Sequence, residues 1–237
     1  IPADAVPSSS EADAAALEHG RRVGGFLMRV VALVLTLLTG FSGLVYEVAW
    51  QKILAILLGS HSEATAAVLA IYLGGLAAGY ALFGFVTGRR EQSARARRAS
   101  PQLLRLYGLI EMGIGVWALI FPWLFTGAQM LSVRAPVGNE AVSFAFDVFL
   151  TILLIGPPTV LMGGTIPILT QSLARNLEGA ARIHAWIYAF NTAGAFVGAL
   201  AGGFILVPLL GLDGVVRTMA LVNLGAGAIF FALGGGK

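Results

Sequence analysis

Three acidic side chains stand out in this sequence because they fall within or beside long apolar runs. They are Glu47, Glu111 and Asp147. A charge at the centre of a lipid bilayer costs at least about 2.5 kcal/mol even on the insertion scale, so such a residue usually faces protein and has a task. Carboxylates of this kind can carry a cation or a proton across the apolar layer, or bind an amine. The sequence therefore offers these residues as a candidate intramembrane polar site.

A structural role is the alternative for each carboxylate. Glu47 would pair with Lys52 or with an interfacial tyrosine, and Asp147 would lie near the outer headgroups. Glu111 would hydrogen-bond a neighbouring helix. The structural interpretation is favoured for Glu47 and Asp147, because either can lie at an interface. For Glu111, well inside its apolar run, both interpretations stay open.

Aromatic residues accompany Glu47 in the stretch GFSGLVYEVAWQKIL. Tyr46 and Trp50 are four residues apart, and Glu47 and Trp50 are three apart, so they would share one side of a helix. We expect them, with Lys52, to form a polar and aromatic collar near the outer interface, where tyrosine and tryptophan prefer to lie. The last candidate for the polar site, Asn191, is interpreted as an amide that joins two helices.

Signatures of other chemistry are missing from the sequence. Cysteine is absent, and His61 and His184 have no second histidine or cysteine at ligand spacing, so we expect no metal site. There is no nucleophile elbow, phosphate loop or zinc motif. We therefore expect no catalytic residue and no cofactor in this chain, and an enzymatic activity is disfavoured.

The elements that must position these residues are membrane helices. Of the residues, 57% are hydrophobic and 11% charged, with a mean hydropathy of +0.85, whereas a soluble domain carries about 25% charged residues. A helix needs about 20 apolar residues to cross a bilayer, and six stretches suffice. They run from about 26 to 43 or beyond, 66 to 88, 103 to 125, 144 to 169, 185 to 210 and 214 to 233. We predict an all-α, polytopic transmembrane bundle over residues 26–237, preceded by a polar, flexible or weakly helical tail, residues 1–25.

The distribution of positive charge predicts how the bundle is oriented. Most arginines fall on one side of six alternating spans, and cytoplasmic loops carry such an excess. Both termini are therefore expected in the cytoplasm. The densest cluster is Arg89, Arg90, Arg95, Arg97 and Arg98. We interpret it as this orientation signal, with anionic lipid headgroups as partners, and not as a nucleic-acid site.

Two stretches are expected to bend or break their helices. The stretch from Phe26 to Gly59 would be roughly 50 Å long as one helix, against a hydrocarbon core of about 30 Å, so it must kink, tilt or re-enter. The segment TGFSG, residues 39–43, is the predicted kink. The segment GPPTVLMGGTIP predicts a broken or kinked helix, because proline leaves a backbone carbonyl unpaired. Its breaking residues are Pro157, Pro158, Gly163, Gly164 and Pro167.

Glycines at every fourth position predict close helix crossings. Gly75 and Gly79 form one such pair. Gly194, Gly198 and Gly202 form a ladder that lies on one helix face. Small residues at this spacing let two membrane helices approach closely. No convincing internal repeat is evident along the sequence.

Five apolar blocks follow one another between about Gly40 and Leu212. They read GFSGLVYEVAWQKILAILLGS, AVLAIYLGGLAAGYALFG, YGLIEMGIGVWALIFP, PPTVLMGGTIPILTQ and IYAFNTAGAFVGALAGGFILVPLLGL. In this order they resemble the membrane domain of the bacterial spermidine-synthase-like membrane proteins. The resemblance implies a major-facilitator-like helical region that precedes a soluble aminopropyltransferase-type domain on the cytoplasmic side. The glycine-rich turn and catalytic aspartates of that soluble domain have no counterpart here, so no catalytic residue is carried over.

Three functions are compatible with these features. The favoured one is a non-catalytic integral membrane subunit or anchor domain, because few polar residues face the bundle interior and glycine ladders suit packing. It would belong to a larger assembly with other membrane subunits, to a homo-oligomer, or to a chain whose soluble domain is absent from this sequence. The second is a transporter of small cations or polyamines that uses Glu111 and Glu47. The third is the membrane part of an aminopropyltransferase-like enzyme, as the resemblance implies.

Overall fold

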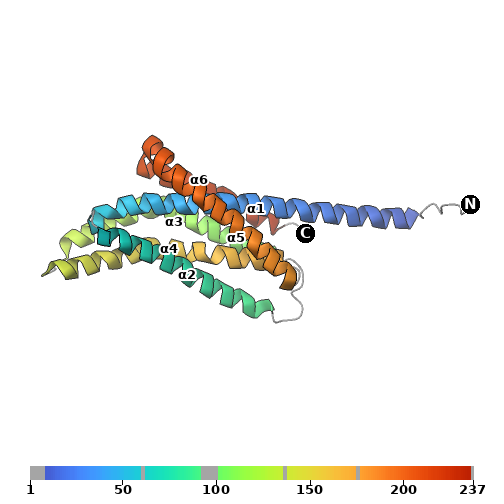
Figure 1. Ribbon diagram of the computed structural model, residues 1–237, viewed down its shortest axis with the longest axis horizontal. Helices are drawn as coiled ribbons and strands as arrows, with labels where there is room; N and C mark the ends of the chain where they lie inside the picture. The colour runs from blue at the N-terminus through green and yellow to red at the C-terminus, as the bar shows by residue number, and fades with distance from the viewer. Residues whose placement is uncertain (1–8, 60–61, 92–100, 136–137, 175–176, 236–237) are drawn as a thin grey trace, which may run out of the picture.

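The fold is a bundle of long helices (Figure 1). The computed structural model describes residues 9–59, 62–91, 101–135, 138–174 and 177–235, and every regular element within them is a helix. The helices are α1 (Ser9–Leu58), α2 (Ser62–Glu91), α3 (Pro101–Arg134), α4 (Glu140–Leu173), α5 (Leu177–Ala201), the π-helical turn η1 (Gly202–Leu206) and α6 (Val207–Leu233). The all-α prediction is confirmed.

Five stretches of the described chain are long and apolar enough to cross a membrane, which supports a membrane protein. The difference from the six predicted spans lies in the last stretch, Gly179–Leu233, which joins α5, η1 and α6. Within it Gly211 has φ 69° and ψ 171°, which is not helical. Residues with a β-carbon rarely adopt this backbone conformation, so glycine allows a turn here. The chain turns at Gly211 into a separate arm, residues 212–233.

The kink predicted at residues 39–43 does not interrupt α1, which is helical from Ser9 to Leu58. The glycines of this segment serve close packing instead of bending. A β-carbon at Gly40 would overlap the backbone carbonyl of Asn191, and the carbonyl of Gly43 accepts a hydrogen bond of 2.9 Å from the Tyr72 hydroxyl. Residues 9–25 of the predicted tail belong to the same helix, and residues 1–8 lie outside the described residues.

The proline-rich segment does not break its helix, because α4 is continuous from Glu140 to Leu173 and contains all three prolines. The kink that was the other form of this prediction stays a prediction. Pro158 has no N–H to give to the carbonyl four residues earlier, that of Leu154. The Nε1–H of Trp117 on α3 donates to this carbonyl instead, at 2.8 Å. A neighbouring helix thus satisfies the freed backbone group, which is how membrane helices tolerate proline.

Two helix pairs lie side by side and are joined by a third. α1 packs along α5, and α2 packs along α4. α3 packs against α6, and these two connect the pairs through contacts of α3 with α4 and of α6 with α1. In the view of Figure 1, α1 runs along the upper part of the bundle with part of α6 above it, and α2 and α4 cross each other below α1.

This packing is symmetric under the exchange of α1, α2 and α3 with α4, α5 and α6. The β-carbon positions of glycines make matching contacts in the two halves. Between α1 and α5, the contacts are Gly40 with Asn191, Gly194 with Leu37, and Gly198 with Phe41; between α4 and α2, the matching contacts are Gly163 with Leu76, Gly79 with Val160, and Gly164 with Phe83, in the same order. Between α3 and α6, the contact of Gly108 with Phe231 matches that of Gly227 with Met112, and the contact of Gly115 with Ala220 matches that of Gly234 with Pro101. Within each exchanged helix pair, matched residues are separated by one constant interval along the chain.

The matched contacts reveal an internal repeat that the sequence alone did not show. Each repeat comprises three helical arms, and the third arm of the second repeat is the one that follows Gly211. When α1, α2 and α3 are exchanged with α4, α5 and α6, each helix makes the contacts of its counterpart. A two-fold rotation relates two sets of helices that exchange in this way.

Gly79 and Gly74 on α2 offer a matched test of the close packing. A β-carbon at Gly79 would overlap the backbone of Val160, whereas one at Gly74 meets nothing within 4 Å. We expect Gly79→Ala to lower the free energy of unfolding by about 1–3 kcal/mol through overpacking. Gly74→Ala should be neutral or stabilising by up to about 1 kcal/mol, because alanine favours the helix. Unfolding in mixed detergent micelles measures both, and equal effects would contradict the crossing.

Candidate functional site

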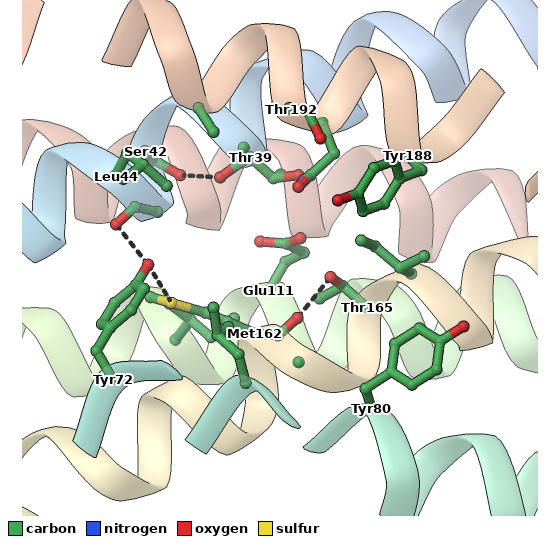
Figure 2. Close-up of a pocket in the computed structure, with 18 of the residues that line it drawn as sticks. Thr39, Ser42, Leu44, Tyr72, Tyr80, Glu111, Met162, Thr165, Tyr188 and Thr192 are labelled. Carbon is green, nitrogen blue, oxygen red and sulfur yellow. Dashed lines mark hydrogen bonds between the residues drawn. The ribbon is translucent and has the colours of Figure 1, made fainter. Parts of the chain in front are cut away.

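A cavity of about 370 Å³ lies at the centre of the bundle, lined by residues of α1 to α6 (Figure 2). It separates the α1–α5 pair from the α2–α4 pair. Gly40 and Gly43 line it from α1, and Gly163 lines it from α4, so glycines leave room where the helices converge. Its volume falls within the range of about 300–1,000 Å³ that is typical of small-molecule sites.

Glu111 of α3 projects into this cavity, as Figure 2 shows. Its side chain is only 1% exposed. One carboxylate oxygen, Oε2, accepts a hydrogen bond of 2.6 Å from the Nδ2 of Asn223 on α6. The other oxygen, Oε1, is buried and makes no hydrogen bond to the described residues, although the hydroxyls of Tyr107 and Thr39 lie close enough to interact with the carboxylate. A buried oxygen without a partner is costly, so it points to a group that the cavity can receive.

Asn223 is itself held in place by α1. The hydroxyl of Tyr46 donates to its Oδ1 at 3.3 Å, which leaves the amide Nδ2 to donate to Glu111. One turn before Glu111, the hydroxyl of Tyr107 hydrogen-bonds that of Thr39 at 3.2 Å. Residues of α1, α3 and α6 thus fix the carboxylate with one oxygen bound and one oxygen available.

Aromatic rings form much of the remaining wall. Figure 2 shows Tyr72 and Tyr80 of α2 on one side of the cavity and Tyr188 of α5 on the other. The ring of His184 lies behind the last two, with its centroid 6.4 Å from that of Tyr80 and 6.5 Å from that of Tyr188. The Nδ1 of His184 hydrogen-bonds the hydroxyl of Thr170 at 3.1 Å, which holds the imidazole in place. The faces of aromatic rings attract cations.

Glu111 is the one charged residue among those that line the cavity. Its carboxylate therefore has no counter-ion in the cavity wall. A buried carboxylate without a cation is strongly disfavoured, because desolvation is not repaid by an ion pair. The site can hold a cation or a proton on Oε1, and its aromatic walls add to the attraction for an organic cation.

The other predicted carboxylates do not join this site. Neither Glu47 nor Asp147 is among the residues that line the cavity. Glu47 is half-buried on α1 and interacts electrostatically with the hydroxyl of Tyr72. Asp147 lies on α4, and its buried Oδ1 has no hydrogen-bond partner within the described ranges. Of the three carboxylates, the structure brings only Glu111 to the cavity.

The polar and aromatic collar predicted around Glu47 is wrong. Tyr46 and Trp50 are completely buried in the bundle, and their rings stack with centroids 4.9 Å apart. Trp50 also contacts the ring of Phe121 on α3 at 5.4 Å. Lys52 is exposed on a different face of α1. The spacing of Tyr46 and Trp50 does place them on one side of the helix, but that side faces the core.

The remaining candidates take different places. Asn191 lines the cavity from α5, and its backbone carbonyl packs on Gly40. Gly163 of the proline-rich segment also lines the cavity, and Pro167 supplies no N–H to the Gly163 carbonyl. Arg89 and Arg90 fall in the last turn of α2, whereas Arg95, Arg97 and Arg98 lie outside the described residues. Within the described part of the chain, no group of three or more His, Asp or Glu side chains could hold a metal ion.

Sequence reasoning missed Asn223 and the tyrosines Tyr72, Tyr80 and Tyr188. A signal was present for Asn223, since it is an amide in the middle of an apolar run, as Asn191 is. The tyrosines gave none, because a tyrosine in a membrane helix is more often interfacial.

Comparison of the chain with protein-family models, with curated proteins and with solved structures finds no match. The geometry of the cavity is therefore the basis for a functional assignment.

Asn223→Leu tests how the carboxylate is held. The change removes the donor to Glu111 and the acceptor of Tyr46. We expect the free energy of unfolding to fall by about 1–3 kcal/mol, because buried polar groups lose their partners. In a Glu111→Leu background the same substitution should lower the free energy of unfolding by a clearly smaller amount, because the carboxylate that Asn223 binds is already absent. Detergent unfolding of the four proteins gives this double-mutant cycle, and additive effects would contradict the coupling.

Proposed function

We propose that the protein is an integral membrane carrier that binds a small organic cation in its central cavity. The observation that carries the proposal is Oε1 of Glu111, a buried carboxylate oxygen that makes no hydrogen bond to the described residues, beside a cavity of about 370 Å³ whose wall offers it no cation. An ammonium group placed there would supply the missing charge and, where it carries N–H groups, the missing hydrogen bond.

The walls suit a cation with apolar substituents better than a hydrated metal ion. Tyr72, Tyr80 and Tyr188 line the cavity with aromatic rings, while hydroxyls such as that of Thr165 offer few polar contacts. Aromatic rings around a desolvated organic ammonium contribute about 2 kcal/mol or more. A linear polyamine is one member of this substrate class, which retains the amine alternative raised by the sequence.

The internal repeat supports transport over simple binding. Transporters built from inverted repeats place the substrate near the bilayer midplane, at the interface of the two repeats. Here Glu111 comes from the first repeat and its partner Asn223 comes from the second. The sequence-based preference for a non-catalytic subunit depended on a scarcity of interior polar groups, and the Glu111 site reduces that support. Membership among the spermidine-synthase-like membrane proteins remains a proposal based on the sequence blocks.

The proposed topology has six spans with both ends in the cytoplasm of a bacterial cell. In this proposal the turn at Gly211 divides the last apolar stretch into two spans, so that the two three-arm repeats would start from opposite sides of the membrane. The excess of arginine near the end of α2 and the start of α3 supports the orientation. The contact of Gly234 with Pro101 and Arg105 places the end of α6 beside the start of α3, at the same end of the bundle.

Glu111→Gln tests the proposal, because glutamine can still accept from Asn223 while it removes the charge. The full chain in mild detergent is titrated calorimetrically with tetramethylammonium and, separately, with putrescine. We expect binding of at least one cation, weakened roughly thirtyfold or more by the substitution, since truncating a buried charge pair costs about 2 kcal/mol or more. Glu140→Gln, at an exposed carboxylate on α4, is the matched control and should bind normally.

Flux measurements extend this test to transport. Proteoliposomes that contain the wild-type protein should take up the cation that binds, and those with Glu111→Gln should not. Saturable binding without uptake would support a binding subunit. Equal binding by wild type and Glu111→Gln would place the cation elsewhere and remove the main support for the carrier.

A further inference from the structure

We infer that the cavity exchanges its organic cation for a proton at Oε1 of Glu111, so that the carrier moves the two in opposite directions. The inference rests on the proposed cation site and names the ion that is coupled to it. Three observations support it. Glu111 is the one charged group among the residues that line the cavity, and its Oε1 makes no hydrogen bond to the described residues. The hydrogen bond from Asn223 to Oε2 can form with either occupant.

The charge balance of the cavity permits one positive occupant at a time. Glu111 is the single charged group in the wall. With a monovalent cation or with a proton, the site is neutral; with neither it is a bare carboxylate in an apolar bundle. Desolvation makes the bare state the least stable. A carrier therefore changes conformation most readily in either of the two neutral states, and each occupant must leave before the other binds.

No second group in the wall can take over the proton near neutral pH. The titratable groups that face the cavity or the Glu111–Asn223 pair are phenols: Tyr46 from α1, Tyr72 and Tyr80 from α2, Tyr107 from α3 and Tyr188 from α5. A phenol ordinarily titrates near pH 10, far from the range of a carboxylate. The described cavity residues of α4 and α6 add hydroxyl and amide groups, such as those of Thr165 and Asn223, but no titratable ones. Two further titratable residues lie outside the cavity wall: Glu47 beyond Tyr72, and His184 behind Tyr80 and Tyr188, where its Nδ1 hydrogen-bonds Thr170.

The hydrogen bond from Asn223 does not need to change during the exchange. Its Nδ2 donates to Oε2 whether Glu111 is a carboxylate or a carboxylic acid protonated on Oε1. Tyr46 fixes the direction of the amide in both cases. The exchange is then confined to Oε1: its O–H bond breaks, the proton passes to water, and the carboxylate pairs with the cation. One positive charge leaves as one enters.

Proton release on binding is the direct test. Tetramethylammonium carries no titratable proton, so any proton released on binding comes from the protein. Calorimetric titrations of the full chain between pH 5 and 8, in pairs of buffers with different ionisation enthalpies, count the protons. At the acid end we expect close to one proton released per cation. We also expect an apparent affinity that weakens about tenfold per pH unit there, because the cation competes with the proton.

Two variants separate the sources of the proton. Glu140→Gln should release as many protons as wild type, since Glu140 is exposed and remote from the cavity. Any residual cation binding by Glu111→Gln should release none and should not depend on pH. Proton release that survives in Glu111→Gln would overturn the assignment to this carboxylate.

The outcomes distinguish this inference from the proposed function. Binding of tetramethylammonium without proton release across the whole pH range overturns the exchange and leaves the cation site standing. Failure of the wild type to bind any cation overturns the proposed function itself. In proteoliposomes, exchange of one cation for one proton is electroneutral, so a pH gradient should drive uptake and an imposed membrane potential should not. Uptake driven by potential alone would contradict the coupling.

Discussion

Close backbone contact at glycines is the constraint on which the structure depends. Gly194 and Gly198 bring α5 against α1, and Gly79 and Gly163 bring α2 against α4. In a membrane no hydrophobic effect drives helices together, so van der Waals contact between closely approaching backbones must do so. Because each pair is tight within itself, the space between the two pairs is left for the cavity.

The scaffold is symmetric, but the chemistry within it is not. By the constant interval that relates α3 to α6, the position equivalent to Glu111 is Phe230, and the position equivalent to Asn223 is Leu104. Phe230 and Leu104 are buried apolar residues. A repeat thus supplies two equivalent positions at the centre, and only one of them is charged. That asymmetry gives the cavity a single anionic group, which one ammonium group or one proton neutralises.

Proline and glycine show how the surroundings determine what a local signal means. The prolines of α4 predicted a break, yet the helix continues because Trp117 donates to the carbonyl that Pro158 leaves free. The paired glycines of α1 predicted a kink, yet they are packing positions under α5 and Tyr72. Gly211, which the sequence did not single out, makes the turn, because its φ of 69° is open to glycine. Local propensity identified special residues and misjudged their roles.

The sequence by itself determined that the chain forms long apolar helices, that glycines at every fourth residue make tight crossings, and that Glu111 is buried. These properties follow from composition and spacing along one helix, which a sequence displays directly. Only the tertiary structure decided that Glu111 meets Asn223 and Tyr46, that Glu47 and Asp147 stay outside the cavity, and that the chain contains a two-fold repeat. These facts depend on which helices pack against each other. The local pattern of residues along one helix does not indicate which distant helix it contacts.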